Sequence, residues 1–506
     1  MKQFVLFLVA LFGSMLMVYA QVPAGIKYTS ASGISSLKKN AEFEIVSVSY
    51  DLQYKPMGSR DPAPTYIITA KQSGKEYTIY AKDLPKDLQL KATEDNIHNY
   101  WFAKNLGSLR TISELSNLYE LRSDIEADAN EYISRLSRYN LIFEDPYLES
   151  YLYSVVSKIL PNKRADGFPY DINIVIVRDP SINAAVFPNG TMIVNTGLLA
   201  ATHTEDELVA VLAHEIAHFV ANHTLVNIRK MEKAQARAEF WAAMGTVLTA
   251  AAEAAAGSTG YYYSNGSVTA NSAILSYSIA ASILKRIGMD YSKEQEEEAD
   301  KMALDVLKYL GYDQNAAASV FQRMADIYTE EGNWAAYYLA GDHPSLEERI
   351  KYCGKPNLKV DSDFEKMVSF AVTSAAITKF NQGRFTQAQK LVDQNIKNNV
   401  GTDDDYLIKA LCLLNLYSDN AHNKEASSMI LKAKAINSGN TNILRTEIIA
   451  CLRNNDLNGA STAIEKYIAR INDSLEKATD NSSSHYRFLL EELDWARKMS
   501  VKVRGL

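Results

Sequence analysis

Two histidines four residues apart, with a glutamate directly after the first, have the residue types and the spacing of a metal-binding site. They are His214, Glu215 and His218 in HEIAH, within a stretch whose apolar residues recur at helical spacing. One helical turn brings both imidazoles to the same face, where they can bind one zinc ion with Glu215 beside it. The chain has only eight histidines, so a chance match is disfavoured, although the motif alone does not establish a site.

A catalytic zinc site needs a third protein ligand and a position open to water. The pattern H-E-x-x-H-x-x-G-x-x-H fails here, because Ala221 and Thr224 stand where it requires Gly and His. His223 is one residue out of that register. On a continued helix His223 points away from the pair, which favours a structural role over ligation.

The remaining source of a ligand is a carboxylate from a second predicted helix, residues 291–307. An acidic run usually forms a solvated helix face. Glu296 and Asp300, however, lie one turn apart and could both face the zinc helix. The residues alone leave the third ligand open among these carboxylates.

Four motifs in a fixed order carry a resemblance to a known family. HEIAHFVANH and EQEEEADKMAL, preceded by NAAVFPNGTMIVNTGLL and followed by HPSLEERI, resemble the gluzincin metallopeptidases. That family includes the CAAX prenyl endopeptidase, the HtpX heat-shock protease and periplasmic peptidases with tetratricopeptide tails. The resemblance covers roughly residues 110–355 and implies a zincin-type peptidase domain with a small sheet.

The resemblance also implies roles for individual residues. One Zn²⁺ per chain would be bound by His214, His218 and Glu296, with Asp300 fixing a ligand imidazole. Glu215 would be the general base that takes a proton from the attacking water.

The developing oxyanion needs a donor besides zinc, and our candidates are His343 and Arg349 in HPSLEERI. His343 could alternatively occupy the open zinc position and silence the enzyme. The plainer interpretation is that these residues form only a helix start and a surface salt bridge.

Substrate is expected to add a strand to the exposed edge of the small sheet, along Asn183, Ala184, Ala185 and Val186, because these residues resemble the substrate-side strand of the same family. Backbone pairing tolerates many sequences, so specificity would come from access to the site. The Ala-rich insertion at residues 232–290 is predicted to form a mobile cover. A structural helical hairpin unrelated to gating is an equally good interpretation of this insertion.

The elements that must position these residues follow from their periodicity. Alternating apolar and polar residues predict short strands in residues 21–105, and helical spacing follows in residues 106–160, where Asp145-Pro146 opens a helix. Residues 171–177 alternate as a strand, and a hairpin with residues 188–190 at its tip comes next.

The C-terminal part is predicted to be entirely helical. Aligned segments bring Ala388, Ala426 and Ala460 to spacings of 38 and 34 residues, close to the tetratricopeptide period. Small residues there would let paired helices pack closely. An irregular helical bundle is the alternative, and either one is a separate helical domain.

We therefore expect an α+β, mostly helical chain. It would comprise a signal peptide (1–20), a β-rich N-terminal region (21–105), a zinc metallopeptidase domain (106–360) and tetratricopeptide-like repeats (361–506). A length of 506 residues allows about three domains.

The N-terminus resembles an export signal. Lys2 precedes an apolar run at residues 4–18, and small residues precede Gln21, which favours cleavage over an uncleaved anchor. We expect a soluble protein in the periplasm or outside the cell. Two further apolar stretches, residues 240–257 and 273–288, are interrupted by charges and predict buried or interfacial helices, with peripheral membrane contact as an option.

Composition narrows the functions further. The formal net charge of −7 offers no strong basic field, so nucleic acid is not an expected partner. The leading hypothesis is an exported zinc endopeptidase, with a protein quality-control role, whose helical repeats recruit substrate or a partner protein. The alternatives are a latent peptidase that acts as a chaperone-like binding or assembly module, and a purely structural repeat protein without metal.

Overall fold

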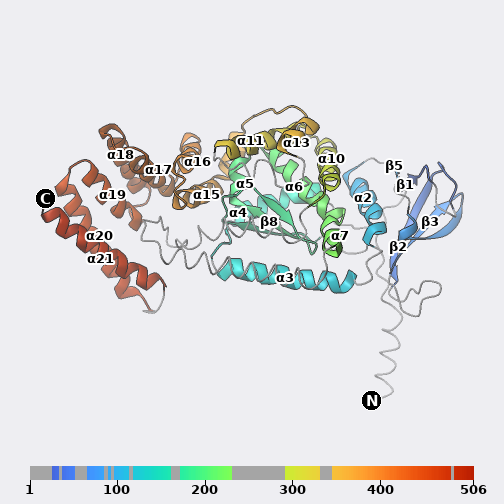
Figure 1. The fold of residues 1–506 in the computed structure, drawn as a ribbon, viewed down its shortest axis with the longest axis horizontal. Helices are drawn as coiled ribbons and strands as arrows, with labels where there is room; N and C mark the ends of the chain where they lie inside the picture. Colours follow the sequence, from blue (N-terminus) through green and yellow to red (C-terminus); the bar gives the residue numbers. More distant parts are fainter. Residues whose placement is uncertain are drawn as a thin grey trace, which may run out of the picture.

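The computed structural model describes residues 26–32, 37–51, 65–84, 89–92, 96–112, 118–138, 140–160, 171–230, 291–330, 345–479 and 484–505. Figure 1 shows an elongated molecule, with an antiparallel sheet at one end, a mixed α/β body in the middle and paired helices at the other end. The predicted fold class, α+β and mostly helical, is confirmed.

A five-stranded antiparallel sheet forms the N-terminal end, as the alternating pattern predicts. Its order is β4-β3-β2-β1-β5. The strands are β1 (Ile26–Thr29), β2 (Phe43–Asp51), β3 (Thr65–Gln72), β4 (Lys75–Tyr80) and β5 (Gln89–Ala92), and a short 3₁₀ turn, η1, spans Ala81–Asp83. Helix α2 (Ile97–Ile112) joins the core of this sheet through Phe102, Leu106 and Leu109.

The same helix α2 also contacts the middle of the molecule. Trp101 donates its indole N–H to the carbonyl of Ile159 at 2.5 Å, and Asn105 donates its amide to the carbonyl of Val220 at 3.1 Å. The proposed division between residues 105 and 106 therefore falls within a helix that both parts share.

The middle of the molecule contains a small mixed sheet of order β6-β8-β7, with β6 parallel and β7 antiparallel to β8. The predicted strand and hairpin are thus confirmed, and Asp145 caps its predicted helix by accepting from the amides of Tyr147 and Leu148. The elements are α3 (Leu118–Arg138), α4 (Pro146–Ile159), β6 (Asn173–Val177), β7 (Ala184–Val186), β8 (Thr191–Asn195), α5 (Thr196–Ala201), α6 (Glu205–Val220), α7 (His223–Lys230), α10 (Lys293–Leu310), α11 (Ala316–Glu330) and α13 (Leu346–Cys353).

Paired helices make up the C-terminal end. After α14 (Ser362–Met367) come α15 (Ser369–Asn381), α16 (Phe385–Lys397), α17 (Asp403–Leu416), α18 (Asn420–Ile436), α19 (Thr441–Arg453), α20 (Leu457–Lys477) and α21 (Ser484–Arg504). Ala388, Ala426 and Ala460 each lie fully buried near the start of the second helix of a pair. Their common place in three successive helix pairs agrees with the aligned alanines of the sequence.

The first long helix of this part, α15, belongs to the core of the middle part. Val368, Ala371, Val372 and Ala375 are fully buried in the same apolar cluster as helix α6. The proposed domain limit at residue 360 is therefore not a break in the hydrophobic core.

Several predictions concern residues outside the described ranges. These are the signal peptide (1–20), the insertion at 232–290 with its two apolar stretches, and His343. Among the helices that the structure does describe, none is both long and apolar enough to span a bilayer.

Candidate metal centre

Helix α6 carries the two histidines in a fixed setting. Thr204 begins the helix by accepting a hydrogen bond from the amide of Glu207, and the acidic first turn suits the positive end of the helix dipole. Both His214 and His218 are buried, at 8% and 1% exposed. A helix packed on nearly all sides holds its ligand histidines to narrow rotamer choices.

Helix α10 packs against α6 and brings the carboxylates. Ser292 and Gln295 form a capping box that fixes the first turn of α10, and Glu296 and Asp300 follow one turn apart. Both carboxylates are buried, at 6% and 3% exposed. Buried carboxylates require partners, and here the partners are histidines and an arginine.

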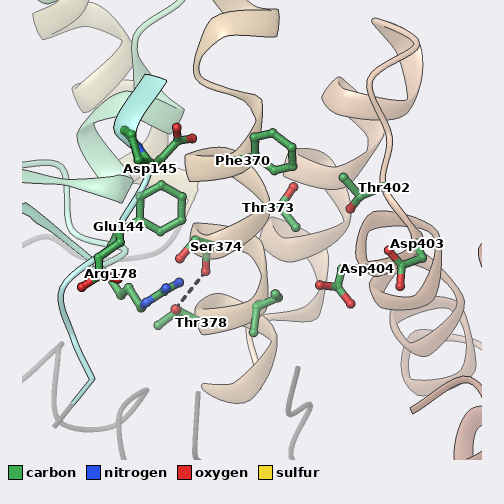
Figure 2. Close-up of a pocket in the computed structure, with 13 residues that line it drawn as sticks. Glu144, Asp145, Arg178, Phe370, Thr373, Ser374, Thr378, Thr402, Asp403 and Asp404 are labelled. Atoms are coloured by element: carbon green, nitrogen blue, oxygen red, sulfur yellow. Dashed lines mark hydrogen bonds between the residues drawn. The ribbon is translucent and has the colours of Figure 1, made fainter. Parts of the chain in front are cut away.

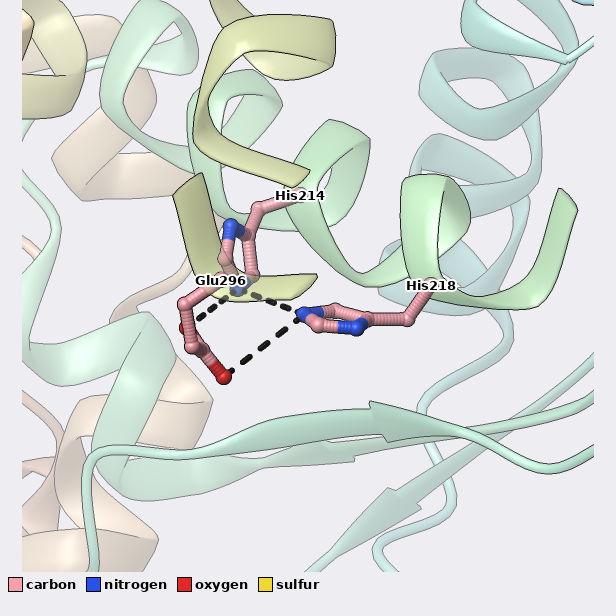
Figure 3. A group of neighbouring side chains, drawn as sticks. All are labelled: His214, His218 and Glu296. Carbon is pink, nitrogen blue, oxygen red and sulfur yellow. Dashed lines mark hydrogen bonds and ion pairs between the residues drawn. The ribbon is translucent and has the colours of Figure 1, made fainter. Parts of the chain in front are cut away.

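Figure 3 shows His214, His218 and Glu296 converging from the two helices. The Nε2 atoms of the histidines lie 3.1 Å apart, and Glu296 oxygens lie 3.4 Å from Nε2 of His214 and 3.8 Å from Nε2 of His218. Ligand atoms ~2.0–2.2 Å from a tetrahedral zinc are about 3.3–3.5 Å apart. The spacing and chemistry of this donor set therefore fit a zinc ion.

The second ring nitrogen of each histidine has a partner of its own. Nδ1 of His214 lies 2.9 Å from Oδ1 of Asp300, as the resemblance implies for Asp300. Nδ1 of His218 lies 2.9 Å from Nδ1 of His223, and the ring of Tyr291 stacks on His218 with centroids 3.6 Å apart. These outer contacts leave both Nε2 atoms facing Glu296.

The prediction that His223 points away from the pair is wrong. It assumed a continued helix, but α6 ends at Val220 and Asn222 takes a left-handed conformation with φ 59°. The turn carries the ring of His223 back against His218. An Asn after Ala221 is a helix-stop signal, so the sequence held the information. Tyr291 lies 73 residues after His218, and no sequence signal indicated it.

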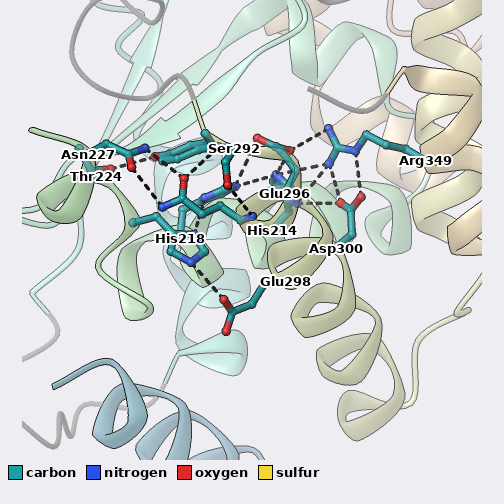
Figure 4. A network of polar contacts seen from close by, with 12 residues as sticks. His214, His218, Thr224, Asn227, Ser292, Glu296, Glu298, Asp300 and Arg349 are labelled. Atoms are coloured by element: carbon teal, nitrogen blue, oxygen red, sulfur yellow. Dashed lines mark hydrogen bonds and ion pairs between the residues drawn. The ribbon is translucent and has the colours of Figure 1, made fainter. Parts of the chain in front are cut away.

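Arg349 lies against the same carboxylates, in the network shown in Figure 4. Its guanidinium donates to Asp300 through Nε at 2.9 Å and Nη2 at 2.6 Å, and Nη1 lies 3.4 Å from Glu296. The ring of Phe321 lies 4.1 Å from the guanidinium carbon. The contacts fix Arg349 beside the donor set, and its role as an oxyanion donor remains a prediction.

The charges in this site shift the pKa values of its groups in different directions. Burial lowers the pKa of His214, but hydrogen bonds and charges of Asp300 and Glu296 outweigh burial and raise it to about 9. Burial and the charge of His214 hold the pKa of His218 well below its usual value. Burial raises the pKa of the Glu215 carboxyl to about 7, a value suited to a general base.

The predicted substrate strand lies beside helix α6, but it is not exposed. β7 is an edge strand, as expected, and it contacts α6. Ala184, Ala185 and Val186 are nevertheless at most 4% exposed, so the expectation of an open edge is wrong. Two contacts cover this strand. Helix α6 packs against β7, and Phe187, directly after β7, packs against Tyr132 of α3.

A separate cavity of about 460 Å³ lies where α4 and the end of β6 meet α15 and α17 (Figure 2). It shares no residue with the metal-binding set. Arg178 lines it with its guanidinium carbon 4.9 Å from the ring centroid of Phe143, and Nε of Arg178 has no hydrogen-bond partner among the described residues. The cavity is therefore a feature of the junction with the helical repeats.

Comparisons with known proteins agree with this geometry. Residues 146–356 match the sequence profile of Peptidase family M48. The chain is 25% identical over 274 residues to the beta-barrel assembly-enhancing protease of Escherichia coli (strain K12), covering 53% of this chain and 51% of the relative. It is similar to the mitochondrial metalloendopeptidase OMA1 of Schizosaccharomyces pombe, at 28% identity over 40% of this chain and 50% of the relative. For OMA1 of Saccharomyces cerevisiae the identity is 25%, over 40% and 52%. The chain thus spans about half the length of each of these relatives.

Proposed function

Residues 146–356 belong to Peptidase family M48, and from this premise we propose that the chain is a zinc-dependent endopeptidase of exported proteins. The single observation that carries the proposal is the buried set of His214, His218 and Glu296, with Glu215 on the same helix. Two neutral nitrogens and one carboxylate are the ligand set of a catalytic zinc site with a position left for water.

A zinc ion, when bound there, supplies a Lewis acid that polarises a carbonyl and makes water more acidic. Side chains of the protein would transfer the proton and hold the ligands in place. Glu215 accepts the proton of the attacking water and delivers it to the leaving amine. Asp300 holds the ring of His214 by its Nδ1 atom.

Substrate binding is proposed along Asn183, Ala184, Ala185 and Val186, where an extended peptide would pair with the backbone of β7. His343 and Arg349 are our candidates for stabilising the oxyanion. Because the edge at β7 is buried, substrate entry requires a local rearrangement before pairing.

The rest of the chain is proposed to choose and hold protein substrates. The helical pairs from α15 to α21 would act as tetratricopeptide-like repeats that recruit a substrate or partner protein. A relative is named for enhancing beta-barrel assembly, which supports exported proteins as the substrate class and quality control as the role. The apolar N-terminus supports export to the periplasm.

The test is the variant Glu215→Gln. We expect it to bind one zinc per chain, as the wild type does, and to lose at least about 100-fold in cleavage of a denatured protein, because the base is removed while the ligands stay. Elemental analysis and product mapping by mass spectrometry measure the two quantities. Undiminished turnover in this variant would refute the mechanism.

The buried β7 edge favours a second function, a latent peptidase that acts mainly as a chaperone-like binding or assembly module. This alternative requires stoichiometric zinc but little proteolysis in the intact chain. Activity would then return after deletion within residues 257–270 or in His343→Ala. Full activity of the intact chain rejects latency.

A further inference from the structure

Two residues behind His218 have no part in the function proposed above. His223 presents Nδ1 to His218 Nδ1 at 2.9 Å, and its Nε2 lies 3.4 Å from Oε2 of Glu298. We propose that His223 is a positioning residue that fixes the ring and the proton of His218, with Glu298 fixing His223 in turn. This inference rests on the proposed zinc site.

The positions of the ring protons in the contacts from His218 through His223 to Glu298 follow from the chemistry of imidazole. If Nε2 of His218 faces the metal, its ring proton lies on Nδ1 and is donated to His223. Nδ1 of His223 must then be the acceptor, so its own proton lies on Nε2 and points toward Glu298. The carboxylate is an acceptor only, which selects this one arrangement.

The backbone around His223 is built to hold the ring there. Asn222, in the left-handed conformation, donates its amide to Ser108 of α2 at 2.8 Å and to the carbonyl of Val220 at 3.1 Å. His223 itself is 5% exposed. Helix α2 from the N-terminal part thus supports the turn that places His223, which links that part to the metal centre.

The two ends of this row of contacts differ in burial, because His218 is buried and Glu298 is partly exposed. His218 is 1% exposed and is covered on one face by Tyr291, whose hydroxyl lies 2.9 Å from Oγ1 of Thr224. The side chain of Glu298 is about half exposed. A buried ring whose Nδ1 lost its acceptor would carry an unsatisfied N–H, or would change tautomer and remove the lone pair from Nε2.

The arrangement also distinguishes His223 from a metal ligand. The nitrogen that His223 directs inward contacts Nδ1 of His218, whereas the three ligand atoms of the metal set lie within 4.8 Å of one another on the Nε2 side. Its effect on a metal is therefore exerted through His218.

The experiment compares zinc affinity in His223→Leu and His223→Asn of the full chain, by competition with a chelator. Leu removes the acceptor at similar size, while Oδ1 of Asn stands where Nδ1 of His does. We expect about 10–100-fold weaker zinc binding in His223→Leu and rescue to within about threefold in His223→Asn. A matched control is His203→Leu, because His203 pairs with Glu365 far along the chain at 2.6 Å and has no contact with the metal set.

Melting of the metal-free variants establishes that each folds, and His203→Leu should change melting without changing zinc affinity. If His223→Leu does not fold, Glu298→Ala against Glu298→Gln gives the same comparison one step further out, with weaker zinc binding expected only in the Ala variant. Unchanged zinc affinity in a folded His223→Leu, or no rescue by Asn, overturns the inference alone. A wild-type chain that binds no zinc overturns the proposed function as well.

Discussion

At the scale of single residues, the surroundings of His214 and His218 shift the pKa values of the two rings in opposite directions. His214 lies between Asp300 and Glu296, which favour its protonated form, while burial favours neutral His218. Arg349 and His214 together also hold the pKa of Asp300 below its usual value, although burial alone would raise it. The proton on His214 therefore occupies the position that a metal needs.

Zinc binding should consequently release a proton from His214. Its pKa is about 9, so at pH 7.5 the ring is protonated without metal and must be neutral with metal. Apparent zinc affinity should rise up to about tenfold per pH unit between pH 7 and 9 and level off above. Calorimetry in two buffers of different ionisation enthalpy at pH 7.5 counts the protons.

Glu215→Gln is the control for that count, because Glu215 has a pKa of about 7 and can contribute a fraction of a proton. The variant should still release about one proton. Binding heats that do not depend on the buffer would contradict the protonation of His214.

At the scale of elements, close backbone packing around the small sheet positions helix α6. Gly197, at the start of α5, has no room for a side chain, because an added Cβ would lie 2.3 Å from the backbone carbon of Pro180. Its amide donates to the carbonyl of Asp179 at 2.8 Å. This contact ties the end of β6 to α5, the element that precedes α6.

Gly197→Ala should therefore lower the free energy of unfolding by about 3 kcal/mol, because the clash is with backbone atoms that cannot rotate away. Gly107 provides the matched control. It lies in the middle of α2 with no atom within 4 Å of an added Cβ, so Gly107→Ala should stabilise by about 0.5–1 kcal/mol. Urea unfolding measures both, and equal effects of the two substitutions would contradict this interpretation.

At the scale of the whole molecule, the parts share cores and polar contacts and do not meet only through linkers. Helix α2 belongs to the core of the N-terminal sheet and to that of the middle part through Trp101. At the other side, His203 pairs with Glu365 at 2.6 Å and accepts at its carbonyl from the amide of Asp361 at 2.9 Å. These contacts join the segment between α5 and α6 to the first turns of the C-terminal helices.

Truncation tests this sharing of the core. A chain that ends after Val360 loses Val368, Ala371, Val372 and Ala375 from the cluster that contains α6. The loss of their burial should cost about 5 kcal/mol and lower solubility. A chain that ends after Asn437 keeps α15 to α18 and should retain the stability of the middle part. Equal urea midpoints for the middle part in the two chains would show that the core ends at residue 360.

Local patterns by themselves indicated the candidate metal-binding residue types and most elements. The helix carrying His214 and His218, the strand at 171–177 and its following hairpin depend on periodicity and turn residues, which act over a few positions. The choice of Glu296 came from a family resemblance, since several carboxylates on α10 satisfy the same spacing.

Only the tertiary structure decided what surrounds the metal-binding set. The reversal of His223, the stacking of Tyr291 and the clamp of Arg349 on Asp300 bring together residues up to 135 positions apart. The burial of β7 and the shared core of α15 are likewise long-range packing effects. Contacts of this kind depend on how whole elements pack, and the free energy of that packing is not encoded in the pattern of any one segment.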